Sequence, residues 1–151
     1  MFVSREFTFD SAHFLTDYYG KCERMHGHTY KLEVTLDGNV QNNGLVIDFV
    51  VFKRVVNKHV LEKLDHHVLN DIIKNPSAEN IVLWIWDQLL DLQKLLREEM
   101  NDPNLGEDIK VFFEKNDGKE PLKTDAFHDT LRLHEVKLWE TPNTCITYRG
   151  K

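Results

Sequence analysis

The sequence has little cysteine, no excess of positive charge and no long apolar run, and each lack argues against a class of protein. Two cysteines among 151 residues are too few for a small secreted disulfide scaffold, so we expect a reducing, cytoplasmic environment. A formal net charge of −6 argues against a nucleic-acid partner, because non-specific binding depends on neutralising phosphates. No apolar stretch approaches the roughly 20 residues of a membrane helix, and the early residues show no secretory signal. We therefore expect no membrane partner.

Alternating apolar and polar side chains predict four β-strands, two near each end of the chain. A period of two places every second side chain on one face of a strand. The strands are predicted at residues 2–9, 29–38, 131–139 and 145–148. Two helices are predicted between the pairs, because apolar residues recur there at helical spacing.

The predicted helices have caps that fix where they begin. Asp48 can cap a helix that runs through residue 64, and Ser77 can cap a second helix that runs to about residue 100. A single domain of 151 residues with this order of elements indicates an α+β fold, in which two helices cover one face of an antiparallel four-stranded sheet. Such a sheet leaves two bare edges, which assembly of several chains into a barrel would remove.

Residues 101–130 have a different character from the rest of the chain. Asn, Asp, Gly and Pro interrupt any long element there, and acidic residues predominate. We interpret this stretch as an excursion from the domain, with a short strand at 109–113.

Two histidines one residue apart, His26 and His28, can reach a single metal ion together, because residues i and i+2 of a strand face the same side. His13 follows the first predicted strand and supplies a third nitrogen if the two strands are neighbours. Three protein ligands with an open fourth position are typical of a catalytic zinc site. Zinc suits ligation by imidazole alone, although iron and copper also take imidazole. The alternative is that these are surface histidines.

Three further positions carry groups suited to proton transfer or binding. Cys22 lies between Lys21 and Glu23, with Arg24 beyond, and nearby positive charge favours its thiolate. The thiolate is either a base or a fourth metal ligand, and we favour the base because a fourth ligand would close the site. The alternative is that Cys22 is a small buried hydrophobic side chain with no role in the chemistry.

Asp65 followed by His66 indicates a carboxylate that orients an imidazole. The alternative is a solvated helix end, and His67 competes with its neighbour for the same role. Glu140 precedes a Pro turn. It is either an exposed acid or a carboxylate that accepts two parallel N–H bonds from a flat ligand.

Five stretches together resemble the 6-pyruvoyltetrahydropterin synthase superfamily, and most closely its bacterial 6-carboxytetrahydropterin synthase branch. They cover most of the chain outside residues 101–130. The stretches are Phe9-Asp10-Ser11-Ala12-His13, Cys22 with His26-Gly27-His28, Leu64-Asp65-His66-His67-Val68-Leu69-Asn70, Pro76-Ser77-Ala78-Glu79-Asn80 and Trp139-Glu140-Thr141-Pro142-Asn143.

The resemblance implies a tunnelling fold (T-fold) of four strands and two helices. In that family, trimers close a twelve-stranded barrel, and two trimers stack into a hexamer with sites between chains. The resemblance also implies that zinc is held by three residues, His13, His26 and His28. The substrate would be the pterin 7,8-dihydroneopterin triphosphate. The products would be 6-carboxy-5,6,7,8-tetrahydropterin, acetaldehyde and triphosphate, in the pathway to queuosine and other 7-deazaguanines.

By the same resemblance, Cys22 is the proton acceptor, and Asp65 with His66 forms a second acid/base pair. Glu140 would hold the guanidine-like edge of the pterin ring and couple to this relay. Ser77 stands where the family usually has Thr. Because the hydroxyl is kept, we expect only a small change in substrate binding.

The sequence leaves the branch and the class open. The spacing Cys-x-x-x-His-Gly-His matches the 6-carboxy branch rather than the animal 6-pyruvoyl enzymes. However, Glu23 lies three residues before His26, where a related branch places a catalytic Glu and makes 6-hydroxymethylpterin. An alternative of another class is a non-catalytic, zinc-bound T-fold binding or assembly protein. A zinc hydrolase is disfavoured, because the His-Glu-x-x-His signature is missing.

Overall fold

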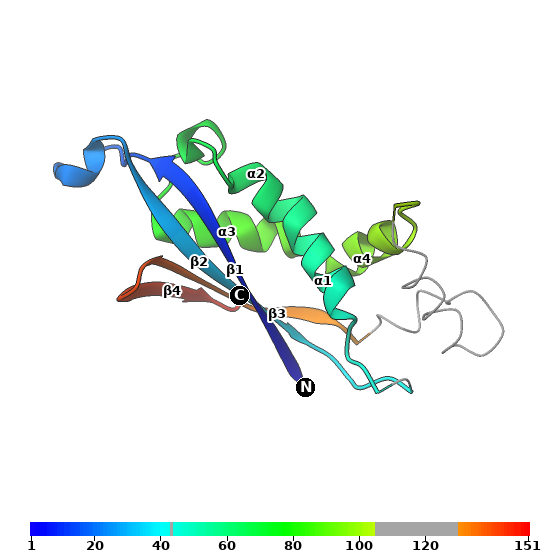
Figure 1. The fold of residues 1–151 in the computed structure, drawn as a ribbon. Helices are drawn as coiled ribbons and strands as arrows, with labels where there is room; N and C mark the ends of the chain where they lie inside the picture. The colour runs from blue at the N-terminus through cyan, green and yellow to red at the C-terminus, as the bar shows by residue number, and fades with distance from the viewer. Residues whose placement is uncertain (43, 105–129) are drawn as a thin grey trace.

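Four strands form one antiparallel sheet in a computed structural model of the chain that describes residues 1–42, 44–104 and 130–151 (Figure 1). The strands are β1 (Phe2–His13), β2 (His26–Asp37), β3 (Arg132–Thr141) and β4 (Thr144–Tyr148). They lie side by side in chain order, and each pairs with the next in antiparallel register. The predicted α+β class is confirmed, whereas the strand predicted at 109–113 lies outside the described residues.

The first two strands extend further than their side-chain pattern predicts. β1 continues to His13 and β2 begins at His26, and these two residues face each other at the end of the ladder. The last residues of β1 and the first of β2 are mostly polar, so they hide the alternation from which the strands were predicted. The ladder itself needs only backbone N–H and C=O groups. The two chain segments that carry the histidines are therefore strands rather than loops.

The core lies on one face of the sheet. On β2, every second side chain from Tyr30 to Leu36 is fully buried, and on β1 Phe7 and Phe9 are buried. The helices cover this face (Figure 1). Burying each such side chain contributes about 1.5–3 kcal/mol to folding.

One continuous helical stretch confirms the helix predicted over 49–64. It consists of α1 (Phe49–Val56), a π-helical turn η2 (Asn57–Leu61) and α2 (Glu62–Leu64). The carboxylate of Asp48 accepts hydrogen bonds from the backbone N–H groups of Val50 at 2.7 Å and Val51 at 3.2 Å. The predicted N-cap is thus confirmed, and it satisfies two of the four donors that a helix start leaves open.

The prediction of a single helix from 77 to 100 is wrong, because the structure has α3 (Ala78–Leu89) followed by α4 (Leu92–Met100). The chain leaves helical geometry at Asp91, whose ψ is 53°. Apolar spacing continues across this break because both helices bury one face, so the period does not reveal a change of direction. α4 packs beside α1, where Arg54 donates to the buried carboxylate of Glu99. None of the helices in the described part of the chain is long and apolar enough to cross a membrane.

We expect Asp48→Ala to lower the free energy of unfolding by about 1 kcal/mol, because the first turn of α1 loses its cap. Urea unfolding followed by circular dichroism, at a fixed zinc concentration, measures the change. Asp48→Asn is the matched control, since Asn caps nearly as well. Equal stability of the Ala variant and the wild type would show that this cap contributes nothing.

Candidate metal centre and active site

The ends of β1 and β2 bring His13, His26 and His28 together. His13 lies opposite His26, and Ser11 lies opposite His28. Because alternate residues share a face, the three imidazoles continue the core-facing row of the sheet beyond Tyr30. Each offers a ring nitrogen, and these nitrogens lie within 4.8 Å of one another. His13 is buried and the other two histidines are half-buried.

Backbone carbonyls fix the orientation of two of these rings. Nδ1 of His13 lies 2.7 Å from the carbonyl oxygen of Pro76, and Nδ1 of His26 lies 2.7 Å from that of Arg24. A carbonyl can only accept, so these partners assign the proton of each ring to Nδ1. In this tautomer each Nε2 is the atom free to bind a metal, and the two Nε2 atoms are 3.1 Å apart. Such carbonyl contacts orient histidines that ligate metals.

His28 supplies the third nitrogen in a neutral state. Its Nε2 is buried and has no hydrogen-bond partner among the described residues. Burial lowers the pKa of His28, and the neighbouring His13 and His26 lower it further, while Glu140 acts in the opposite direction. Three imidazole nitrogens gathered within 4.8 Å of one another fit a divalent ion such as zinc. The cluster can thus hold a metal.

Glu140 lies directly against this cluster. Its Oε1 is 3.4 Å from Nε2 of His13 and 3.8 Å from Nε2 of His28. The sequence suggested a carboxylate that binds a flat ligand. In the structure this carboxylate lies beside two imidazole nitrogens of the cluster.

Sequence reasoning missed Tyr30 as part of this site. Its hydroxyl oxygen lies 3.4 Å from Nδ1 of His13. Burial raises the pKa of Tyr30, and Glu140 raises it further, so the hydroxyl stays neutral. Tyr30 was interpreted as an ordinary core position of its strand. The available signal was its spacing, since it follows His28 by two residues and so shares the face of the histidines.

Asp65 and His66 form a hydrogen-bonded pair just after α2. Oδ1 of Asp65 lies 2.9 Å from Nδ1 of His66 and also accepts the backbone N–H of Asp10 at 2.9 Å. The Asp10 N–H lowers the pKa of Asp65, and the bond from His66 adds to this. An ionised carboxylate therefore orients the imidazole. The structure pairs Asp65 with His66 rather than His67, whose backbone carbonyl instead accepts the N–H of Ala12 at 3.1 Å.

His66 is held in an uncommon backbone conformation. Its φ is +60°, in the left-handed region that non-glycine residues rarely adopt. Its backbone N–H donates to the carbonyl of Asp10 at 2.6 Å, which ties the turn to the edge of β1. Backbone conformations of this kind cost about 1–3 kcal/mol and gather at functional sites.

The histidine cluster lies on the core face of the sheet, whereas the Asp65–His66 pair lies at the outer edge of β1. Asp10 precedes Ser11 and Thr29 follows His28, so their side chains project from the face away from the cluster. The hydroxyl of Thr29 donates to the carboxylate of Asp10, and that carboxylate lies within 4.8 Å of the groups of Asp65 and His66. A cavity of about 500 Å³ adjoins this pair, and its lining includes His28 of the cluster as well as His66 and His67.

Cys22 lies outside the metal cluster. It is a free, half-buried cysteine in the short 3₁₀ turn η1 (Lys21–Glu23). Its sulfur is not among the donor atoms that gather at the three histidines, so the structure does not support Cys22 as a fourth ligand. Glu23 is exposed, and its carboxylate accepts the backbone N–H of Tyr19 at 2.9 Å.

Ser77 caps α3, as predicted. Its hydroxyl oxygen accepts the backbone N–H of Asn80 at 3.3 Å. The cap follows directly on Pro76, whose carbonyl orients His13. Ser77 therefore helps to position the metal cluster through the backbone.

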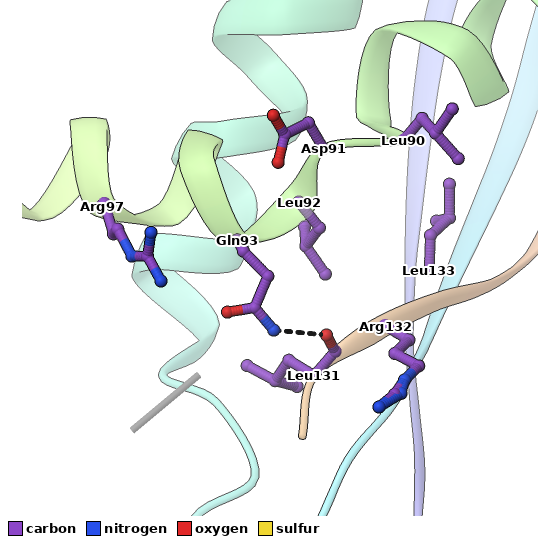
Figure 2. A pocket seen from close by; sticks show the side chains of 8 residues that line it. All are labelled: Leu90, Asp91, Leu92, Gln93, Arg97, Leu131, Arg132 and Leu133. Carbon is purple, nitrogen blue, oxygen red and sulfur yellow. Dashed lines mark hydrogen bonds between the residues drawn. The ribbon is translucent and has the colours of Figure 1, made fainter. Parts of the chain in front are cut away.

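A second cavity, of about 520 Å³, lies where α3 meets α4 and β3 begins. Figure 2 shows Gln93 of α4 reaching across it, where its Nε2 donates to the carbonyl of Leu131 at 2.9 Å. Leu133 pairs with Leu36, near the end of β2, whereas the histidines lie at the start of β2. This cavity is therefore at the opposite end of the sheet from the candidate metal centre.

Comparisons with known protein sequences all point to one family. The sequence model of the family "6-pyruvoyl tetrahydropterin synthase" matches residues 2–115. A 6-carboxy-5,6,7,8-tetrahydropterin synthase of Haemophilus influenzae is 33% identical over 97% of both chains. A dihydroneopterin monophosphate aldolase of Pyrococcus furiosus is 43% identical over 54% of this chain and 68% of its own.

Solved structures of the same kind share the fold. The 6-pyruvoyl tetrahydropterin synthase of Caenorhabditis elegans is 22% identical and superposes with a TM-score of 0.67, covering 100% of this chain and 96% of its own. That of Plasmodium vivax is 25% identical, with a TM-score of 0.58 and coverage of 98% and 97%. These likenesses confirm the predicted T-fold. With a family match over residues 2–115, the chain belongs to the 6-pyruvoyl tetrahydropterin synthase family.

Proposed function

We propose that the protein is a zinc-dependent lyase that converts 7,8-dihydroneopterin triphosphate and water to 6-carboxy-5,6,7,8-tetrahydropterin, acetaldehyde and triphosphate. The observation that carries the proposal is the convergence of the nitrogens of His13, His26 and His28 within 4.8 Å. The choice of product is supported by the 33% identity to the Haemophilus influenzae 6-carboxytetrahydropterin synthase over nearly the whole of both chains. Such a product would feed cytoplasmic synthesis of queuosine and other 7-deazaguanines.

Each group of the chain has a role in the proposed reaction. Zinc held by the three histidines would lower the pKa of the side-chain hydroxyls of the substrate. Cys22 accepts a proton from the side-chain carbon of the substrate. His66, oriented by the ionised Asp65 at 2.9 Å, serves the opposite proton transfer. Glu140 accepts N–H bonds from the guanidine-like edge of the pterin, and Ser77 contributes its hydroxyl to the binding site.

The position of the Asp65–His66 pair supports active sites that are shared between chains. The imidazole cluster lies on the core face of the sheet, whereas the pair is bonded to the outer edge of β1, which is the edge that a neighbouring chain would meet. Both outer strands, β1 and β4, have an unpaired side among the described strands, and pairing these edges in a trimer or hexamer would cover them. We therefore propose a homo-oligomer in which one chain supplies the metal and a neighbour supplies the pair.

A second product class rests on Glu23. This carboxylate is next to Cys22, and the Pyrococcus furiosus relative at 43% identity is a dihydroneopterin monophosphate aldolase. An aldolase would leave a hydroxymethyl group on the pterin, and a 6-pyruvoyltetrahydropterin synthase would leave a pyruvoyl group. In the structure the carboxylate of Glu23 accepts the Tyr19 N–H, which favours a role in holding the loop and hence the 6-carboxy product.

Zinc-loaded protein incubated with 7,8-dihydroneopterin triphosphate should release triphosphate and acetaldehyde and yield the 6-carboxy product in mass spectrometry. Cys22→Ala should keep the fold and the zinc but lower kcat about 10²- to 10⁴-fold, because the base is lost. Circular dichroism and zinc analysis of the variant check that only chemistry has changed.

Each other outcome decides a separate part of the proposal. A hydroxymethyl or pyruvoyl product would replace the 6-carboxy assignment. Unchanged turnover in Cys22→Ala would remove that thiol from the mechanism. A zinc-loaded wild type that releases no triphosphate would favour a non-catalytic T-fold protein.

Two inactive variants should restore activity when they are mixed in one oligomer. His28→Ala damages the metal cluster and His66→Ala removes the second acid/base group, so each variant alone should be inactive. Co-expressed chains should regain a measurable fraction of wild-type turnover, because some sites combine an intact cluster with an intact pair from its neighbour.

The matched control is co-expression of His28→Ala with His26→Ala. Both variants damage the same cluster, so no arrangement of chains yields an intact site, and the mixture should stay inactive. Failure of the first mixture to exceed this control, although mixed oligomers are present by mass spectrometry, would contradict shared sites.

A further inference from the structure

The end of β1 and the residues that follow it are held by the connection between α2 and α3, residues 65–77. Every second backbone N–H from Asp10 to Thr16 donates to this connection. The four acceptors are Oδ1 of Asp65, the carbonyl of His67, Oδ1 of Asn70 and Oδ1 of Asn75, at 2.9, 3.1, 3.0 and 3.0 Å. Most of these acceptors are side-chain oxygens, so the contacts depend on residue type and can be removed by substitution.

Asn70 makes two reciprocal bonds within this series. Its Oδ1 accepts the backbone N–H of Phe14 at 3.0 Å, and its Nδ2 donates to the carbonyl of Phe14 at 2.8 Å. The ladder between β1 and β2 ends where His13 pairs with His26, so β2 offers Phe14 no partner. A side-chain amide carries both a donor and an acceptor, and here the amide of Asn70 takes the place of a strand residue.

The bonds from Asn70 act directly beside a residue of the histidine cluster. His13 stands on the last rung of its ladder, and the ends of elements fray unless further contacts hold them. Its ring also depends on the connection, since Nδ1 lies 2.7 Å from the carbonyl oxygen of Pro76. Bonds that fix Phe14 therefore keep the ring of His13 between this carbonyl and the other two imidazoles.

The same bonds also reach the loop that carries Cys22. Leu15, next to Phe14, donates its backbone N–H to the carbonyl of Cys22 at 2.8 Å. A shift of Phe14 would move Leu15 and with it the backbone of Cys22. The position of the thiol relative to the histidine cluster thus depends on the amide of Asn70.

We propose that Asn70 is a positioning residue, which holds His13 in the metal cluster and keeps the Cys22 loop in place beside it. The proposal rests on the metal centre of the proposed function. Asn70 contacts neither the metal nor the substrate, and it acts through the backbone of Phe14.

Loading the protein with Co²⁺ tests the role toward His13, because the visible d–d bands of Co²⁺ report the geometry of its ligands without any turnover. Asn70→Leu keeps the approximate shape of the side chain but removes both bonds. We expect it to weaken Co²⁺ binding about 10-fold in competition with a chelator and to change the band shape. Asn70→Asp keeps the acceptor for the Phe14 N–H but loses the donor, so its affinity should lie between those of the wild type and Asn70→Leu.

Alkylation of Cys22 by iodoacetamide tests the role toward the loop. Cys145→Ser removes the other free cysteine, so that a single thiol reacts. In this background, with zinc bound, Asn70→Leu should raise the alkylation rate about 10-fold, because a loop that has lost its anchor opens more often.

Asp48→Ala is the matched control for a general loss of stability. Arg5 of β1 donates to the carbonyl of Phe49, so this helix cap lies near the start of β1, whereas His13 ends that strand. The control should keep wild-type Co²⁺ bands and a wild-type alkylation rate, and changes equal to those of Asn70→Leu would contradict a specific role of Asn70.

Each remaining result decides one part of the proposal. Wild-type Co²⁺ bands and affinity in Asn70→Leu would overturn the role toward His13, and wild-type alkylation would overturn the role toward Cys22. If Asn70→Leu does not fold, wild-type behaviour of Asn70→Asp in both measurements would overturn the proposal. A wild type that binds neither Co²⁺ nor zinc would overturn the metal centre itself, and this role of Asn70 with it.

Discussion

The pairing of the end of β1 with the start of β2 is the constraint on which the rest of the site depends. It sets His13 opposite His26 and His28 one step inward, and the pleat turns all three rings to the core face. A slip of one residue would move one strand's side chains to the other face and separate the nitrogens. The apolar row that continues from these rings, with Tyr30 and Phe9 stacked at 4.9 Å, anchors that register through burial.

Loops between the elements supply the backbone carbonyls that orient the histidine rings. The carbonyls of Pro76 and Arg24 set the orientation of two rings, and each carbonyl belongs to a short connection fixed by its own hydrogen bonds. Asn75, next to Pro76, adopts a φ of +48° and its carbonyl accepts the amide of Asn80. The Asp65–His66 turn is joined in the same way to the edge of β1 through Asp10. Uncommon backbone conformations thus cluster where polar groups must be aimed, which is where folds tolerate their cost.

The sequence predicted the architecture well because burial leaves a periodic trace. The alternation in β2, the helix from 49 to 64 and the caps at Asp48 and Ser77 all appear in the structure. The prediction failed where period carries no information: the break at Asp91, where the buried face continues while the helix axis turns, and the polar ends of β1 and β2. Glu140 follows the buried Leu138 by two residues, so alternation in β3 already predicted its face, whereas its closeness to His13 and His28 depends on how the strands pair. The contact of the Pro76 carbonyl with His13 could not be predicted, because every residue has a backbone carbonyl and the sequence does not show where it points.

The candidate chemistry is divided between the core face of the sheet and the outer edge of β1, and this division links the fold to assembly. The histidines look toward the core side, and Asp65 with His66 is tied to Asp10, whose side chain projects from the other side. The most direct measurement of the central claim is a crystal structure of the zinc-loaded protein with anomalous diffraction at the zinc edge. The account predicts one strong peak within bonding distance of Nε2 of His13, His26 and His28. No peak there, or a peak with His13 turned away from the other two rings, would contradict it.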